Sequence, residues 1–141
     1  MSEETKSFDL SQVAVSYLAV PLDGGYGDGA AIKFEKVKPD VVTKEGADGS
    51  VAFSETNSRQ WKVTLTFLST STANAKLSAI KQLPAAAAIG PFAVADLSGA
   101  STFLSPKARI ETWPNFELGA EPTNVEWSFI CAECVVFWGG N

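Results

Sequence analysis

The two cysteines are the residues whose type and spacing come nearest to a chemical site. Cys131-Ala-Glu-Cys134 has the CxxC spacing of zinc knuckles and redox centres. A redox pair opens a helix, whereas these cysteines lie in an alternating strand pattern and are expected to face opposite sides of a sheet. Zinc would need two further ligands, and the sequence has no other cysteine and no histidine. We therefore expect free thiols that act as small buried hydrophobic side chains.

A glycine-rich segment and two acidic groups are the other candidates for ligand binding. Residues 24–29, GGYGDG, have the composition of a phosphate-binding loop, but such a loop must lead into a helix, and the residues that follow predict a strand. No pair of carboxylates is singled out for glycoside hydrolysis. Calcium could be held by one of two groups, although neither spacing matches an EF-hand loop: Asp23 with Asp28, or Asp40 with Glu45 and Asp48. We expect no metal and no cofactor.

The composition argues against an enzyme. Without histidine the chain cannot build a Ser-His-Asp or Cys-His nucleophile, and it lacks the commonest metal ligand. A net charge of −5 opposes the gathering of phosphates by counterion release, so specific binding of nucleic acid is not expected. The length of 141 residues, with 45% apolar and 19% charged residues, fits a single globular domain spanning residues 1–141.

The beginning of the chain predicts a flexible arm and no targeting signal. Residues 1–10, MSEETKSFDL, are polar and acidic, without the basic and apolar regions of a signal peptide. No window approaches 18 uninterrupted apolar residues, so no membrane span is predicted. We expect a protein that folds in a reducing cytoplasm.

Alternating apolar residues predict a mainly β fold. The clearest strand spans residues 60–69, and further strands are predicted in five segments: 11–22, 31–37, 91–97, 101–113 and 123–138. Two of these strands show a single apolar face, formed by Trp61, Val63, Leu65 and Phe67 in one and by Val13, Val15, Tyr17 and Ala19 in the other. The pattern predicts a β-sandwich or β-barrel.

One helix and one protruding hairpin complete the predicted elements. The helix spans residues 72–83, with Ser71 or Thr72 as its cap, Leu77, Ile80 and Leu83 at helical spacing, and Pro84 at its end. Residues 38–51 are polar and contain a Gly-Ala-Asp-Gly turn flanked by valines, which predicts a hairpin that reaches out of the core. The expected fold is thus a sandwich or barrel with one flanking helix.

Several of these segments together resemble a family of tail proteins from contractile-tailed bacteriophages. The shared features are the Gly46–Gly49 turn, the Asn57–Arg59 link, the alternating strand Val63–Leu68, and a helix start at Ser71–Asn74 that leads to Leu77 and Ile80. Asp96-Leu97-Ser98-Gly99 and the aromatic-Gly-Gly-Asn ending at residues 137–141 extend the similarity along the chain.

The resemblance implies a tail tube, or inner tube, protein related in fold to the secretion-system tube protein. It implies six copies in a ring, rings that stack into a tube inside a sheath, and passage of genomic DNA without specific binding. The implied partners are further copies of the chain and the sheath, baseplate and tape-measure proteins. The implied location is the virion tail, assembled in the host bacterial cytoplasm.

Contact residues follow from this hypothesis, because stacking needs a protruding element and ring closure needs exposed apolar side chains. We expect contacts between rings at the hairpin, through Val41, Val42, Lys44, Glu45, Asp48 and Val51. We expect contacts between subunits at Trp61, Trp127, Phe137, Trp138 and Asn141.

Two other functions remain open at this stage. A tail terminator, or another ring-forming tail or baseplate protein, would form rings that do not extend. A carbohydrate-binding β-sandwich would present exposed tryptophans and remain monomeric.

Overall fold

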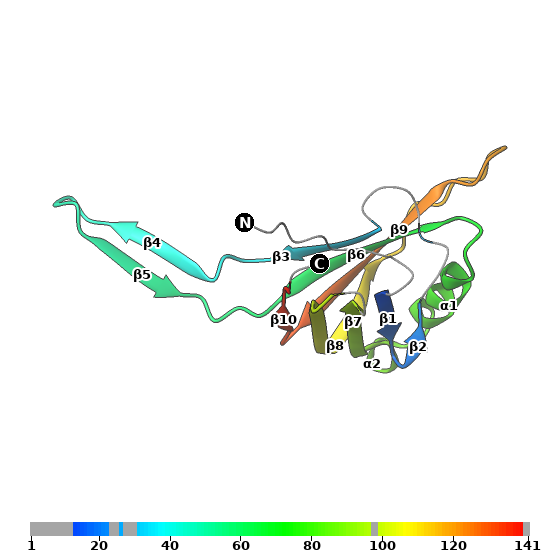
Figure 1. The fold of residues 1–141 in the computed structure, drawn as a ribbon, viewed down its shortest axis with the longest axis horizontal. Helices are drawn as coiled ribbons and strands as arrows, with labels where there is room; N and C mark the ends of the chain where they lie inside the picture. Colours follow the sequence, from blue (N-terminus) through cyan, green and yellow to red (C-terminus); the bar gives the residue numbers. More distant parts are fainter. Residues whose placement is uncertain (1–12, 23–25, 27–30, 97–98, 140–141) are drawn as a thin grey trace, which may run out of the picture.

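The computed structural model describes residues 13–22, 26, 31–96 and 99–139. They form an eight-stranded antiparallel sheet, a separate two-stranded hairpin and two helices (Figure 1). The strands are β1 (Val13–Tyr17), β2 (Val20–Pro21), β3 (Ile32–Lys36), β4 (Val41–Glu45), β5 (Val51–Glu55), β6 (Trp61–Leu68), β7 (Gly90–Asp96), β8 (Thr102–Thr112), β9 (Asn124–Ala132) and β10 (Val135–Phe137). The prediction of a mainly β fold is confirmed.

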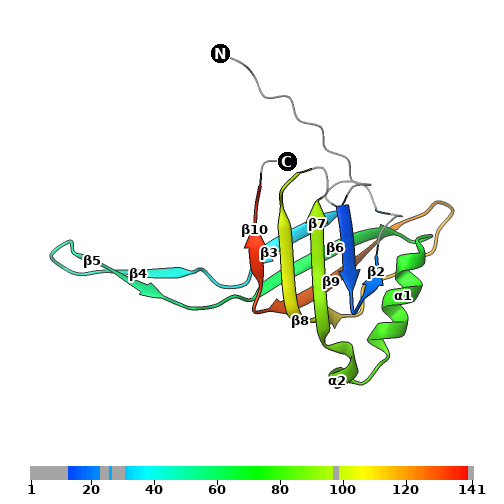
Figure 2. The same ribbon diagram turned by 60° about the horizontal axis from the view of Figure 1, so that its bottom comes forward.

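The large sheet bends back on itself and encloses the core. Its strand order is β2-β1-β7-β8-β9-β6-β3, and β10 pairs with the first part of β8 on the edge that β9 also occupies. Strands β1, β7 and the first part of β8 cross over β9, β6 and β3 (Figure 2). Phe129 on β9 lies between the layers, 5.0 Å from the ring of Phe92 on β7 and 5.2 Å from that of Tyr17 on β1. The sandwich prediction is confirmed, whereas the described strands do not close into a barrel.

The predicted apolar faces are largely those that the structure buries. Val63, Leu65 and Phe67 are fully buried, and Val13, Val15 and Tyr17 belong to the same core. Trp61 is only partly buried, and Ala19 leaves the predicted face altogether. The chain turns at Leu18 and Ala19, which both have positive φ angles (53° and 63°), and returns as the short strand β2.

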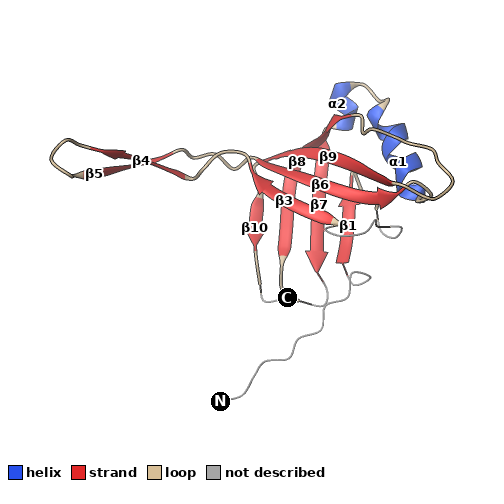
Figure 3. Ribbon diagram, turned by 90° about the horizontal axis from the view of Figure 1, so that it is seen from above, coloured by secondary structure: helices blue, strands red, loops and turns tan. Residues whose placement is uncertain are grey.

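Helix α1 (Thr72–Lys81) packs at one end of the sandwich (Figure 3). Ser71 caps it, because its hydroxyl accepts a hydrogen bond of 3.2 Å from the Ala73 N–H. The helix stops two residues earlier than predicted, and Leu83 is exposed, since Pro84 disfavours helical geometry in the residue before it. The four-residue helix α2 (Ala85–Ala88), which the sequence analysis did not predict, follows Pro84.

The last predicted strand is interrupted at Glu133. Strands β9 and β10 pair with β8 in one continuous register, but Glu133 has a φ of 55° between them. This break shifts the alternation of buried and exposed residues by one position, and β8 makes the matching shift where Pro106 and Lys107 are both exposed. As a result Cys131 and Cys134 are both buried, and the expectation that they face opposite sides of the sheet is wrong.

Candidate assembly surfaces

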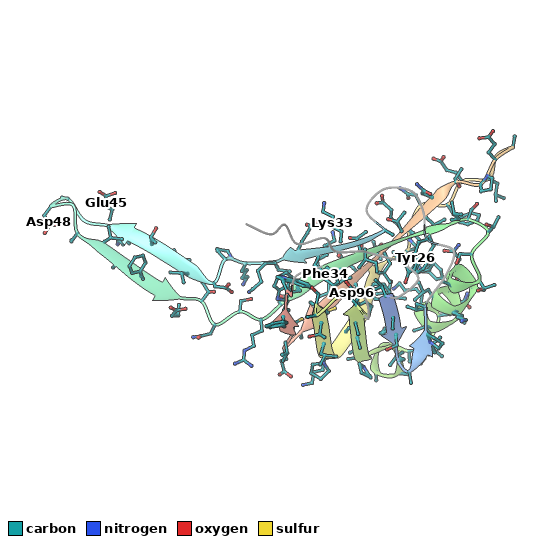
Figure 4. All side chains as sticks on the ribbon, in the orientation of Figure 1. Tyr26, Lys33, Phe34, Glu45, Asp48 and Asp96 are labelled. Atoms are coloured by element: carbon teal, nitrogen blue, oxygen red, sulfur yellow. The ribbon has the colours of Figure 1, made fainter. Side chains whose placement is uncertain are left out.

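The β4–β5 hairpin extends away from the body of the protein, and its second strand ends at Glu55, four residues beyond the predicted range of 38–51 (Figure 1). Among the described strands, its two strands pair only with each other, from Val41 opposite Glu55 to Glu45 opposite Val51. Gly49 adopts a φ of +88° in the turn, a conformation that favours glycine. The hydroxyl and N–H of Ser50 hydrogen-bond the Asp48 carboxylate and hold its pKa below the usual value. The turn is therefore locally specified, and Figure 4 shows Glu45 and Asp48 at the far tip.

The two faces of the hairpin differ in chemistry. The register places Val42, Lys44, Ala52 and Ser54 on one face, and Val41, Thr43, Glu45, Val51, Phe53 and Glu55 on the other. We call the second the apolar hairpin face. Phe53 is 73% exposed, the largest apolar side chain on the hairpin, and the sequence analysis missed it as a contact residue. The sequence did contain a signal for it, because Val51 and Phe53 are apolar residues two positions apart and so lie on the same face of a strand.

A second projection lies at the opposite end of the molecule. Residues 113–123, the distal loop, extend beyond β8 and β9 on the side of α1 (orange in Figures 1 and 2). Its exposed apolar side chains are Trp113, Phe116 and Leu118, of which Leu118 is 86% exposed. Sequence analysis did not identify this loop, because apolar residues in a strand-rich chain usually indicate core.

The base of the distal loop is fixed to the body. Thr123 and Ser69 exchange hydrogen bonds: the Ser69 N–H donates to the Thr123 carbonyl (2.7 Å), and the Thr123 N–H donates to the Ser69 hydroxyl (3.2 Å). The Thr123 hydroxyl donates to the Glu117 carbonyl at 2.8 Å. The ring of Trp113 packs 6.0 Å from that of Trp127 in the core. These contacts hold the loop in a projecting position.

The outer surface of β3, β6 and β9 is polar. It carries a shallow hollow of about 420 Å³ lined by Lys33, Glu35, Lys62, Thr64, Thr66, Asn124, Glu126 and Ser128, which we call the polar face. Lys33 pairs with Glu35 at 3.0 Å, and Lys62 pairs with Glu111 of β8 at 3.6 Å. With Lys107 and Arg109 of β8 added, the charges comprise four basic and three acidic groups, so most of the charge on this surface is balanced.

The outer surface of the other half of the sheet carries no charged side chain at its described strand positions. Alternation and burial place ten small or apolar residues there, which we call the uncharged face: Ala14, Ser16, Pro91, Ala93, Ala95, Thr102, Leu104, Pro106, Val135 and Phe137. Leu104, Val135 and Phe137 are more than half exposed. An apolar sheet surface of this kind is typical of a protein contact.

The C-terminal aromatic residues close one end of the sandwich. Trp138 packs against Phe34 (4.9 Å between ring centroids) and Trp61 (6.0 Å), yet it remains 50% exposed. The next residue, Gly139, lies so close to Ala100 that an added Cβ would be 2.5 Å from the Ala100 Cβ, so this position requires glycine. Trp61, Phe137 and Trp138 therefore reach the surface, as the predicted contact role requires. Asn141, the last predicted contact residue, lies outside the described residues.

Trp127 has a different role from the one predicted. It is only 2% exposed, and its indole N–H donates a hydrogen bond of 2.9 Å to the Asn74 side chain on α1. The Asn74 amide donates in turn to the Leu68 carbonyl at 2.9 Å. Trp127 therefore ties the helix to the sheet and is not available for a subunit contact.

The cysteine pair shows no sign of a metal centre. Both thiols are free, and the Cys134 thiol donates to the Cys131 carbonyl at 3.4 Å. A hydrogen bond with Cys134, together with burial, raises the pKa of Cys131. Among the residues that the structure describes, no cluster of three or more acidic or cysteine side chains is placed to hold a metal, and no helix is long and apolar enough to span a membrane.

Comparisons with known proteins identify relatives of this architecture. The family model described as bacteriophage PhiTE tail tube protein matches residues 12–139. The cap of the anti-feeding prophage, which terminates its tube, is similar in structure: the TM-score is 0.60 at 11% identity, with 97% of this chain and 95% of that chain covered. At this identity the likeness shows a common fold. No curated protein matches the sequence.

Proposed function

The chain belongs to the bacteriophage PhiTE tail tube protein family, and from this premise we propose that its copies close into rings that stack into the conduit for genome ejection. The family consists of structural tail proteins, so the chain is a component of the virion tail. We propose six copies in a ring, the number that the sequence resemblance implies. The whole chain, residues 1–141, would act as one tube domain, with residues 1–10 as an arm, assembled in the host cytoplasm.

One observation carries the ring hypothesis. The half of the sheet that bears the polar face, formed by β8, β9, β6 and β3, ends on each side in a strand edge that could pair with the edge on the other side of a second copy. Within the part of the chain that the structure describes, strand β3 pairs with β6 on one side only. At the other side, the pairing of β8 with β7 ends at Ala108, and Arg109–Thr112 continue along β9. The strands β8, β9, β6 and β3 alternate in direction, so β3 of one copy would run antiparallel to β8 of the next. Contacts between two different sides of a subunit generate closed rings.

The charges at these sides specify a register. An antiparallel junction with Phe34 opposite Ile110 of the next copy places Lys33 opposite Glu111 and Glu35 opposite Arg109. Both are pairs of opposite charge, and such cross-strand pairs contribute about 0.2–1 kcal/mol each. The Ile110 backbone already makes a hydrogen bond with the Tyr17 hydroxyl, so it is not free to pair with β3 of the next copy. The junction would therefore depend chiefly on the charged side chains. Figure 4 shows Lys33 and Phe34 on opposite sides of β3, as this arrangement requires.

This ring would present the polar face to the lumen and the uncharged face outwards. With four basic and three acidic groups per copy, most of the charge on this lumen wall would be balanced, so its attraction for DNA phosphates would be weak, which suits passage without binding. The uncharged face would be the surface for the sheath. Baseplate and tape-measure proteins would meet the ends of the tube and its lumen.

Charge reversal tests the ring junction. Glu35→Arg or Arg109→Glu alone should reduce the yield of rings seen by negative-stain electron microscopy, and the double variant should restore it. Glu126→Arg, on the same face but on the central strand β9, is the matched control and should leave rings intact. Failure of the double variant to recover, with both single variants folded, would reject this junction.

A tail terminator is the second candidate function, favoured by the similarity in fold to a tube-terminating cap. A terminator would form rings that never lengthen. Microscopy of the purified chain at increasing concentration separates the two, since a tube subunit gives long tubes and a terminator gives single rings.

A further inference from the structure

Exposed apolar side chains are concentrated on the two projections. Of the fourteen large apolar side chains that are exposed among the described residues, four lie on the hairpin and three on the distal loop. Neither projection is covered by another part of the described chain, and they extend from opposite ends of the longest axis (Figure 1). Large apolar groups held at two opposite ends need a partner at each end.

We propose that the distal loop of one copy is the docking site for the apolar hairpin face of a second copy in the adjacent ring. The inference rests on the proposed function and names the acceptor for its stacking contact. A contact between opposite ends of identical subunits repeats without closing, which is the geometry of an extending tube. Phe53 of the hairpin and Leu118 of the loop are the central pair, because they are the most exposed large apolar side chains on the two projections.

The charges oppose this contact but do not outweigh it. The apolar hairpin face carries Glu45 and Glu55, and the distal loop carries Glu117 and Glu121. An exposed charge pair is worth several-fold less than the burial of a large apolar side chain. Docking through the other face, whose only charge is that of Lys44, would give attraction to the loop but would leave Phe53 exposed.

The repulsion between these carboxylates determines whether added salt should favour or oppose elongation of the tube. Salt screens repulsion between carboxylates, so raising the salt concentration from about 0.05 to about 0.5 M should promote elongation. Docking through the Lys44 face predicts the reverse. Loss of elongation with increasing salt, while the rings themselves persist, would therefore overturn the proposed face.

Leu118→Asp tests the acceptor. We expect this variant to form rings but no tubes, or to need at least about a tenfold higher concentration for elongation, as seen by electron microscopy and sedimentation. Leu104→Asp, a matched change at an exposed residue of the uncharged face, should leave the tubes of the purified chain unchanged.

Cross-linking gives a readout that is independent of folding defects. Protein with Phe53→Cys mixed with protein carrying Leu118→Cys should form a disulfide-linked dimer under oxidation, and Phe53→Cys mixed with Leu104→Cys should not. If Leu118→Asp forms normal tubes, or forms tubes whose only defect is that sheath no longer binds, the inference is overturned and the tube function still stands. Absence of rings and tubes from the unmodified chain would instead reject the proposed function.

Discussion

Phe53→Ser separates folding from assembly more sharply than any other single change. The side chain is 73% exposed on a hairpin that pairs only with itself, so its loss should not alter the stability of the body. We expect the free energy of unfolding to stay within about 0.5 kcal/mol of the unmodified protein, as for most surface substitutions. The same change should prevent ring stacking.

The size of the stacking defect follows from the exposed area. A phenylalanine side chain buries about 150–250 Å² when fully enclosed, so about 110–180 Å² of Phe53 remains to be covered by a partner. At about 25 cal/mol per Å², complete burial is worth about 3–4 kcal/mol, which is an upper bound. Even half of this amount weakens each contact about tenfold or more, and a ring makes the contact once for each of its subunits.

The assay compares the lowest concentration at which tubes form, measured by sedimentation, with the unfolding midpoint of the unassembled protein in urea. Ser54→Ala, the neighbouring residue on the opposite face of β5, serves as the matched control and should elongate normally. Tubes that form from Phe53→Ser at the normal concentration would refute the argument that this side chain is buried by stacking. A large fall in the unfolding midpoint would refute the independence of the hairpin.

Three further experiments test the core: two substitutions and one measurement of thiol reactivity. Asn74→Ala removes the partner of the buried Trp127 indole and should lower the free energy of unfolding by about 1–3 kcal/mol, and an unchanged urea midpoint would contradict that role. Ser71→Ala removes the cap of α1 and should cost about 1 kcal/mol, seen as a lower urea midpoint, whereas Ser71→Asp should retain most of the stability. Cys131 should resist thiol reagents in the native protein because it is fully buried and its pKa is raised, and two thiols should react after unfolding. Rapid native labelling of Cys131 would show that the strand opens at the break at Glu133.

Elements specified by neighbouring residues were predictable from the sequence. The hairpin has a Gly-Ala-Asp-Gly turn whose Gly49 needs a positive φ, and α1 has a serine cap followed by apolar residues at helical spacing. The interruption at Glu133 was not predictable, since a positive φ at a glutamate depends on its surroundings and not on its own preference.

The assembly surfaces were harder to predict because burial is a property of the whole fold. Trp113 and Trp127 are the same residue type in adjoining parts of the chain, yet one is half exposed on the distal loop and the other is buried beneath α1. Alternation identified the apolar side of each strand. It did not reveal that charged side chains gather on the outer surface of one half of the sheet, four of them in two salt bridges, while the described strand positions on the outer surface of the other half lack charge.

The arrangement of these surfaces argues that assembly follows folding. The body buries its own core, in which Phe92 packs against both Phe103 and Phe129 without help from a neighbouring subunit. The surfaces that remain for assembly point in distinct directions. They are the two outer strands of the half-sheet that bears the polar face, β3 and β8, and the two projections at the ends of the longest axis. Lateral contact through small charge-paired edges is individually weak, whereas end contact through Phe53 and Leu118 is more strongly apolar. A stacked ring therefore stabilises the lateral contacts of the ring beneath it, so elongation should be cooperative and isolated rings should be the less stable species.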